Sequence, residues 1–341
     1  MLLSVIIPTR NRAQYLGNLL DSLAEQQPVP FEWEVIVVDN ASTDATAEVT
    51  HQKSETLPIT IRHVVEPRLG LHYGRHRGAK EARGKVLAYL DDDMILDRQW
   101  IRGTDLLLED KADAVVGRVL PKWEAEPPGW LAALWSKGEH GSACWYLGLL
   151  DLGDLVKPIE PSYVFGGNCF IKKEILSSLG GFHPDAMPSP LLRFRGDGET
   201  GLMVKFKQRG LRSFYDPKAT AFHIIDANKL TVEYVCSRAY NQGISNSFTQ
   251  IRAEYGLAQS VTFNSSIRNR YERHKQMSPS EIVRAVGRKA KGVVCRLRTD
   301  PYAEIRKKIA EAYRAGWQFH QSEVKNDPKL LEYVLKQTYL G

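Results

Sequence analysis

The chain has 341 residues, 43% hydrophobic and 25% charged, which is the ordinary composition of a globular protein with a real core. Its formal net charge of +6 favours anionic partners in general, including nucleotide phosphates, nucleic acid and membrane surfaces. No window holds 18 uninterrupted apolar residues, so a membrane-spanning helix is not expected.

The cysteines and the N-terminal residues indicate in which cellular compartment the protein is expected. The 4 cysteines are far apart and form no Cys-x-x-Cys pair, which disfavours a zinc site. A disulfide framework is also disfavoured in a chain this long, and we expect a reducing compartment. The strand-like run 2–7 begins without the basic start and cleavage site of a signal peptide. We therefore expect a cytoplasmic protein.

The first 95 residues or so alternate between strand and helix patterns. Buried strands are expected at 4–9, 33–38, 59–65 and 86–90, and amphipathic helices at 12–24, after Asp44 and at 71–82. This alternation predicts an α/β fold, with a mostly parallel sheet and helices on both faces. Right-handed crossovers bring all four strand ends to the same rim.

Polar residues follow three of these strands. The turn Pro8-Thr9-Arg10-Asn11 ends the first, Asp39 ends the second, and Asp91-Asp92-Asp93 follow the fourth. Ligands of open α/β sheets bind at such strand ends, so these residues are predicted to share one crevice. Three adjacent carboxylates repel one another and need either a divalent cation or several basic partners. The alternative is an acidic turn that merely follows a strand.

The middle of the chain supplies candidates for the acceptor side. After an expected strand at 113–120, the segment 123–145 carries four tryptophans, Trp130 among them, around a Pro-Pro-Gly turn. We interpret it as a loop or short helix whose aromatic faces stack on sugars or bases, or else as a hydrophobic cover for the sheet edge. Gly166-Gly167-Asn168 form a glycine turn entering a strand, and glycines allow close backbone approach to a ligand.

A second acidic pair opens a helix that runs to Gly210. Asp197 and Glu199 lie in its first turn, where acids often do no more than favour the helix dipole. A short strand at 219–223 then ends in His223, which is either structural or a ligand.

The remainder is expected to be helical, and we divide the chain into a catalytic domain at 1–228 and a helical extension at 229–341. An irregular break is expected at 256–266. Residues 267–298 carry ten lysines and arginines, which form either a solvated helix face or a patch for anionic lipid or acceptor. Residues 314–340 predict a helical hairpin that turns at Asn326-Asp327-Pro328.

The predicted crevice suits a nucleoside diphosphate. Asp39 can accept a hydrogen bond from a base or ribose, and Arg75 can neutralise phosphate. Asp91 and Asp93 can hold a hard cation, Mn²⁺ or Mg²⁺, that bridges two phosphate groups. Neither a Walker loop nor a Gly-x-Gly-x-x-Gly signature is present after the first strand.

Taken in order, these motifs resemble glycosyltransferase family 2 with the GT-A fold, over about residues 2–250. The resemblance is carried by Ser-Val-Ile-Ile-Pro-Thr-Arg-Asn-Arg, Val-Val-Asp-Asn-Ala-Ser-Thr-Asp and Ala-Arg-Gly-Lys-Val-Leu-Ala-Tyr-Leu-Asp-Asp-Asp. Gly166-Gly167-Asn168, the Gly-Asp-Gly-Glu helix start and His223 fit its later part.

The resemblance implies an inverting sugar transfer from a nucleotide-sugar donor, with roles for particular residues. Thr9 and Asp39 would contact the nucleoside, Asp91 and Asp92 the ribose and diphosphate, and Asp93 the metal, with His223 completing the metal shell. The family's base is the second acid of an adjacent pair, which Gly198 splits here. Aligning the helix puts Glu199 at that position, with Asp197 as the alternative.

The predicted mechanism is a single displacement, in which the base takes the proton of the attacking acceptor hydroxyl. We expect a saccharide or lipid-linked acceptor, a role in polysaccharide or glycoconjugate biosynthesis, and peripheral contact with the inner face of the membrane through 267–298. A nucleotidyltransferase is disfavoured by the glycine-free first turn, and a processive synthase by the lack of spanning helices. A non-catalytic nucleotide-sugar binder stays open. A nucleic-acid binder is disfavoured because the basic segment has little aromatic interleaving.

Overall fold

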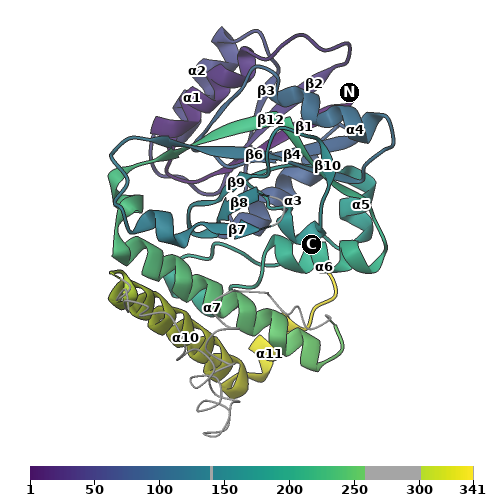
Figure 1. Cartoon of the computed structure of the whole chain (residues 1–341). Coiled ribbons are helices and arrows are strands. Elements are labelled where there is room, and N and C mark those ends of the chain that lie inside the picture. The colour runs from purple at the N-terminus through teal and green to yellow at the C-terminus, as the bar shows by residue number, and fades with distance from the viewer. Residues whose placement is uncertain (139–140, 258–300, 341) are drawn as a thin grey trace, which may run out of the picture.

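The computed structural model describes residues 1–138, 141–257 and 301–340. These residues form a mixed sheet flanked by helices, with a separate layer of long helices against one side (Figure 1). The strands are β1 (Leu3–Thr9), β2 (Trp33–Asp39), β3 (Ile61–Val65), β4 (Val86–Leu90), β5 (Met94–Leu96), β6 (Ala114–Trp123), β7 (Ser136–Gly138), β8 (Gly141–Cys144), β9 (Leu149–Asp151), β10 (Lys157–Pro158), β11 (Asn168–Lys172) and β12 (Ser213–Ile225).

The α-helices are α1 (Ala13–Ala24), α2 (Thr46–Thr56), α3 (Leu71–Glu81), α4 (Asp105–Leu108), α5 (Lys173–Ser178), α6 (Glu199–Gln208), α7 (Val232–Glu254), α10 (Ala303–Asn326) and α11 (Pro328–Val334). Short 3₁₀ helices connect them: η1 (Trp100–Thr104), η2 (Leu131–Leu134), η3 (Trp145–Leu147), η4 (Pro161–Tyr163), η5 (Ser189–Phe194) and η6 (Ala227–Leu230).

The first four strands form the predicted parallel half of the sheet. They lie in the order β3-β2-β1-β4, and every neighbouring pair among them is parallel. Thr9 at the end of β1 is the Cα partner of Asp39 at the end of β2. β11 then pairs antiparallel with β4, which makes the whole sheet mixed. The prediction that the ends of β1, β2 and β4 meet at one rim is confirmed.

Alternate residues of these strands face two separate cores, because successive side chains of a strand point to opposite faces. On one face Val5, Ile7 and Ala88 pack against the leucines of α1. On the other face Ile6 and Tyr89 join a cluster that includes residues of α5 and α6. Such continuous apolar strands, buried on both faces, are typical of a parallel sheet covered by helices.

Two later predictions are corrected. The strand expected at 219–223 belongs to the longer β12, which runs parallel to β6 with a register shift between Asp216 and Ala221. The segment 123–145 is more than a loop or short helix, because it also contains β7 and β8, which pair antiparallel. The extent of β12 depends on β6, which lies far away in sequence, whereas β7 and β8 form a short local hairpin.

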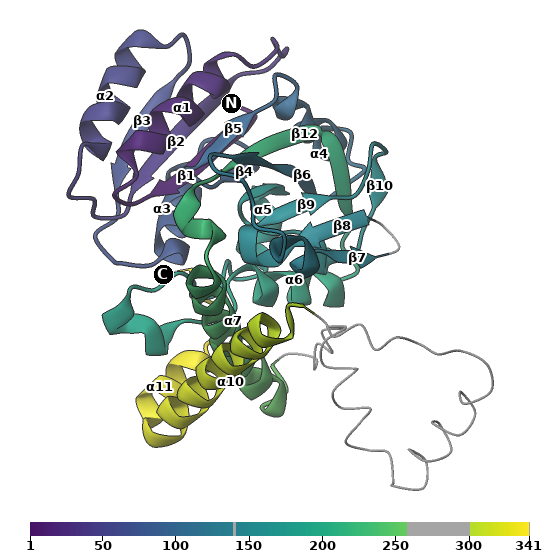
Figure 2. The same cartoon turned by 60° about the vertical axis from the view of Figure 1, so that its left-hand side comes forward.

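The C-terminal helices form the separate layer. α7 and α10 lie side by side in both views, and α11 follows α10 (Figures 1 and 2). The predicted turn at Asp327-Pro328 is confirmed, and Asp327 caps α11 by accepting from Lys329 N and Leu330 N. α10 begins at Ala303, earlier than the predicted hairpin. The chain end then returns to the sheet domain, where Tyr339 N donates to Gly180 O.

Some predictions fall where nothing is described. The basic segment 267–298 and most of the expected break at 256–266 lie outside the described residues. Within the described residues, none of the helices combines the length and the apolar character that crossing a bilayer would need. Cys144, Cys169 and Cys236 are free thiols in this part of the chain.

Candidate active site

A short polar loop follows each of β1 and β2, and the two loops contact each other. Asn11 adopts a φ of 54°, accepts a hydrogen bond from Thr43 N at 2.7 Å and donates through its own N to Ser42 Oγ at 3.0 Å. Asp39 Oδ1 accepts from Ser42 N at 2.7 Å. Asn11 and the predicted nucleoside contact Asp39 therefore lie in loops that hold each other in place.

Pro8 and Thr9 precede the first of these loops, within β1 itself, and both are buried. Gly74 of α3 packs on Pro8, since a Cβ added to that glycine would lie 3.1 Å from Pro8 Cβ. Thr9 lies beside Asp92 at the end of the neighbouring β4, and its hydroxyl favours the charged form of that carboxyl. Thr9 is thus close to the acidic cluster as well as to Asp39, its partner in register.

Arg75 of α3 lies between Glu199 and Asp91, two residues of the predicted crevice, and only 3% of its side chain is exposed. Its Nη1 lies 3.2 Å from Glu199 Oε2, and its Nη2 lies 3.9 Å from Asp91 Oδ1. A Cβ on Gly166 would stand 2.1 Å from Arg75 Nη2, so a larger residue there would displace the guanidinium. Burial opposes its charged form, but Glu199 and Asp91 outweigh it and raise the pKa of Arg75.

The three aspartates differ sharply in their surroundings. The Asp91 side chain is 42% exposed, whereas those of Asp92 and Asp93 are 11% and 7% exposed. Arg12 approaches both buried carboxylates, with Nε 3.8 Å from Asp92 and Nη1 3.0 Å from Asp93. Lys229 Nζ donates to Asp93 Oδ2 at 2.6 Å.

Burial and these charges separate the two buried acids. Burial raises the pKa of Asp92 to about 7, with Arg12 opposing and Asp93 adding to the rise. For Asp93 burial acts in the same direction, but His223, Lys229 and Arg12 outweigh it and lower the pKa. Asp93 is the acid that carries a firmly held negative charge.

His223 ends up next to Asp93, as the resemblance implied. Its Nε2 lies 3.2 Å from Asp93 Oδ2, and its Nδ1 lies 2.7 Å from Leu147 O. Within residues 1–138, 141–257 and 301–340, no group of three or more His, Cys, Asp or Glu side chains is arranged to hold a metal ion. Asp91, the third predicted ligand, lies instead beside Arg75 and Gly167.

Asp93 and His223 nevertheless fit a divalent cation chemically. A carboxylate oxygen and an imidazole nitrogen are suitable ligands for Mn²⁺, and a cation already stands between them, the Lys229 ammonium. Two protein ligands and open positions for donor oxygens would suit a metal that arrives with phosphate.

Glu199 and Asp197 separate into two environments. Glu199 begins α6, faces Arg75 and has a side chain that is 25% exposed. The Asp197 side chain is 3% exposed, and both of its oxygens are used inside the protein. Its Oδ1 lies 2.6 Å from His183 Nδ1, and its Oδ2 accepts from Thr249 Oγ1 at 2.6 Å.

Of the four residues predicted for the acceptor side, some lie at the site and others are enclosed in the protein interior. Gly166 and Gly167 lie against Arg75 and Asp91 in the crevice. Asn168 is fully buried, and its side chain bonds to Trp100 Nε1, Arg118 O and Ala219 O, so it supports the sheet rather than lining the crevice.

Trp130 packs against the core of the sheet and against the cluster of Val235, Ala239 and Ile309 from α7 and α10. Trp145 is 44% exposed and lies over Tyr163 and Phe165, whose rings are 5.9 Å and 6.3 Å from it. Phe165 immediately precedes Gly166. An aromatic cluster therefore does stand beside the crevice, but with Trp145 in place of Trp130.

Sequence reasoning missed Arg12 and Lys229. The need for basic partners was evident from three adjacent carboxylates, but their identity was not, since Lys229 lies 136 positions from Asp93. Lys229 belongs to η6, across which the predicted domain boundary at 228/229 falls. The helical extension thus contributes a charged side chain to the crevice.

The chain is similar in sequence to known glycosyltransferases. Residues 4–180 match the model of the family described as glycosyl transferase family 2. The chain is 32% identical over 117 residues to the glycosyltransferase AglE of Haloferax volcanii, a match that covers 34% of this chain and 38% of AglE. It is 23% identical over 249 residues to the glucosyl-dolichyl phosphate glucuronosyltransferase of the same organism, covering 72% and 76% of the two chains.

Among solved structures, the mannosyltransferase PcManGT of Pyrobaculum calidifontis, in complex with GDP-Man and Mn²⁺, superposes with a TM-score of 0.51. The two chains are 17% identical, and the match covers 98% of this chain and 84% of that one. This likeness supports the expected GT-A fold, with its mixed sheet and helical C-terminal part. The match to AglE spans well under two thirds of that relative's length.

Proposed function

This chain belongs to glycosyl transferase family 2, and from that premise we propose that it transfers a sugar from a nucleotide-sugar donor to an acceptor hydroxyl with inversion. The observation that carries the proposal is the pairing of Glu199 with Arg75 at 3.2 Å beside Asp91, Gly166 and Gly167. A partly exposed carboxylate, held at one oxygen and lying next to glycine backbone, is an arrangement that suits a general base.

For the donor, we assign Thr9, Asn11 and Asp39 to the nucleoside and Asp91 and Asp92 to the ribose and diphosphate. The loops that fix Asn11 and Asp39 support this assignment, because a rigid rim costs little ordering on binding. Pro8 supports the rim from within β1.

For the base, we assign Glu199 and not Asp197. Asp197 is buried and both of its oxygens are engaged, by His183 and Thr249, so an acceptor hydroxyl has no access to it. Arg75 holds Glu199 Oε2 and leaves the other oxygen to accept the hydroxyl proton. The acceptor oxygen then attacks the anomeric carbon opposite the departing diphosphate, and one such attack inverts the configuration.

For the metal, we propose that Mn²⁺ or Mg²⁺ binds with the donor at Asp93 and His223. The bound ion would supply positive charge to the leaving diphosphate. The protein's own contribution is to hold Asp93 ionised and to orient His223 through Leu147 O, so that its Nε2 faces Asp93. Arg12 adds a fixed positive charge at the same place.

For the acceptor, we propose a saccharide, free or lipid-linked, in polysaccharide or glycoconjugate biosynthesis. The aromatic cluster of Trp145, Tyr163 and Phe165 supports a sugar ring, which stacks well on an aromatic face. A relative whose name includes dolichyl phosphate supports the lipid-linked form. A cytoplasmic location, with peripheral membrane contact through 267–298, stays a prediction.

The proposal is tested by Glu199→Gln, which keeps the size of the side chain but removes its basicity. We expect a loss of transfer of about 100-fold or more, with donor binding retained. The matched control is Glu174→Gln, since Glu174 also lies in the first turn of a helix, α5, but is exposed. The measurement is transfer and hydrolysis over a panel of nucleotide sugars with Mn²⁺.

Two results would contradict the proposal. Full transfer activity of Glu199→Gln would remove Glu199 from its role as the base. Tight binding of a nucleotide sugar by the unaltered protein, with neither transfer nor hydrolysis of any donor, would favour the non-catalytic binder.

A further inference from the structure

The Lys229 ammonium occupies the position between Asp93 and His223. Its Nζ lies 2.6 Å from Asp93 Oδ2, 3.1 Å from His223 Nε2 and 3.0 Å from Ile224 O. The side chain is 8% exposed. An ammonium has three protons to donate, and these three acceptors match that number.

The orientation of the His223 ring allows it to accept a hydrogen bond from Lys229. A backbone carbonyl can only accept, so Nδ1 of His223 must carry the proton that reaches Leu147 O at 2.7 Å. In the neutral ring Nε2 then presents a lone pair, and Lys229 donates to it. A lone pair on this nitrogen is also what a metal ion would bind.

Charge in the crevice is nearly balanced when Lys229 is in place. Among the described residues, the carboxylates of Asp91, Asp92, Asp93 and Glu199 face the cations Arg12, Arg75 and Lys229. A divalent ion entering alone would meet the ammonium at close range, where like charges repel strongly in a buried setting. A divalent ion entering with a diphosphate would bring its own negative charge.

Building on the proposed function, which takes Asp93 and His223 as the metal ligands, we propose that Lys229 is the resident cation of this pair and competes with a divalent metal for it. Free metal has to displace the ammonium, so the resting protein binds it weakly. Metal and donor then bind together, because the diphosphate offers oxygens that can accept the protons of the displaced ammonium. The flexible four-carbon stem of a lysine permits such a movement.

The test measures binding of Mn²⁺ alone, by the electron paramagnetic resonance signal of the free ion, without nucleotide or sugar. Lys229→Met removes the competing charge and keeps a long side chain, so we expect it to bind Mn²⁺ about tenfold more tightly than the unaltered protein. Lys229→Arg keeps the charge and should bind as weakly as the unaltered protein.

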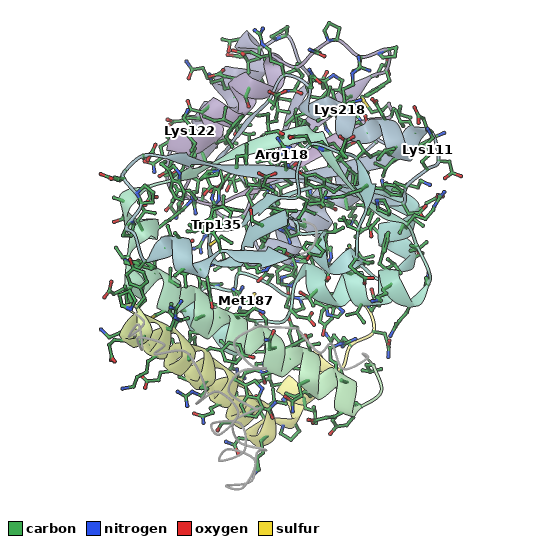
Figure 3. All side chains as sticks on the ribbon, in the orientation of Figure 1. Lys111, Arg118, Lys122, Trp135, Met187 and Lys218 are labelled. Atoms are coloured by element: carbon green, nitrogen blue, oxygen red, sulfur yellow. The ribbon has the colours of Figure 1, made fainter. Side chains whose placement is uncertain are left out.

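Two further variants control the experiment. Lys122→Met removes an exposed lysine of β6, labelled in Figure 3, and should leave Mn²⁺ binding unchanged. Asp93→Asn in the Lys229→Met background should abolish the gained affinity, because it removes the carboxylate that Lys229 and the metal share. The thermal unfolding midpoint of each variant confirms that it is folded, and Lys229→Gln replaces Lys229→Met if the latter is not.

The proposal is overturned if Lys229→Met binds Mn²⁺ no more tightly than the unaltered protein, or if the gained affinity survives Asp93→Asn. Neither result depends on sugar transfer. Failure of the proposed function would instead appear as an absence of transfer in the donor panel, so the two failures are distinguishable.

Discussion

Asp197 and Glu199 are two positions apart, yet the fold gives them different surroundings. Glu199 starts α6 on the side of Arg75, whereas Asp197 points into a buried network with His183 and Thr249. Gly198 makes this divergence possible with a φ of 55°, which residues other than glycine rarely adopt. From the sequence both acids were candidates for the base, because the residues around Asp197 do not show that Thr249, 52 positions away on α7, bonds to it.

The network around Asp197 gives a prediction at this scale. Thr249→Val keeps the shape of the side chain but leaves Asp197 Oδ2 buried without its donor, so we expect a loss of about 1–3 kcal/mol of unfolding free energy. The measurement is urea unfolding at neutral pH. Thr56→Val is the control, since Thr56 bonds Gln52 O on an exposed helix surface. Equal stability of the two variants would show that the Asp197 contact is not important.

At the scale of elements, the close crossing of α7 and α10 rests on two glycines. A Cβ on Gly243 would lie 2.1 Å from Tyr313 O, and one on Gly316 would lie 2.0 Å from Tyr240 O. Real Cβ atoms do not approach backbone oxygens so closely, so any larger residue must push the helices apart. This crossing positions α7, which carries Thr249 to Asp197.

We therefore expect Gly243→Ala and Gly316→Ala each to destabilise the protein by about 1–3 kcal/mol, the range for overpacking. Gly17→Ala in α1 is the matched control, because the nearest atoms to its added Cβ are at 3.7 Å. Helix propensity alone should make that control up to about 1 kcal/mol more stable. Chemical unfolding of the three variants measures these differences, and a gain of stability at Gly243 would contradict the packing argument.

For the whole molecule, buried histidines make stability depend on pH. Burial lowers the pKa of His72 and His320 to about 4 and that of His76 to about 3, from an ordinary value of 6.5. The unfolded chain therefore binds more protons than the folded one between about pH 6.5 and 4. Their contribution to stability is complete above pH 6.5 and is lost as the pH falls. The raised pKa of Asp92 acts in the opposite direction.

His320 isolates one such contribution, since its ring is fully buried and Nδ1 lies 2.8 Å from Ser247 Oγ. As the pH falls from 6.5 to 5, both proteins should lose unfolding free energy. We expect the loss to be about 2 kcal/mol smaller in His320→Gln than in the unaltered protein. His51→Gln, at an exposed position on α2, should follow the unaltered protein. Urea unfolding at several pH values gives the comparison, and parallel curves for His320→Gln would contradict it.

Much of the fold could be read from local pattern. The parallel strands, their shared rim and the turn at Asp327-Pro328 were predicted correctly, because hydrophobic period and helix caps are recorded within a few neighbouring residues. The extent of β12 was not predicted, because it depends on pairing with β6 far along the chain. The β7–β8 hairpin was also missed, although its paired residues are close in sequence, because the segment was interpreted from its tryptophans and its Pro-Pro-Gly turn.

The site shows the same division. Residue types and order were enough to bring Asp39, Asp93, Glu199 and His223 forward as candidates, since in the sequence pattern each ends or follows an expected strand or starts an expected helix. Tertiary contacts alone decided that Asn168 supports the sheet, that Asp197 is enclosed, and that Lys229 stands between Asp93 and His223. The charge balance of the crevice is a sum over Arg12 before α1, three aspartates after β4, and residues of α3, α6 and η6. Distances in space, which the order of residues does not contain, determine each interaction in that sum.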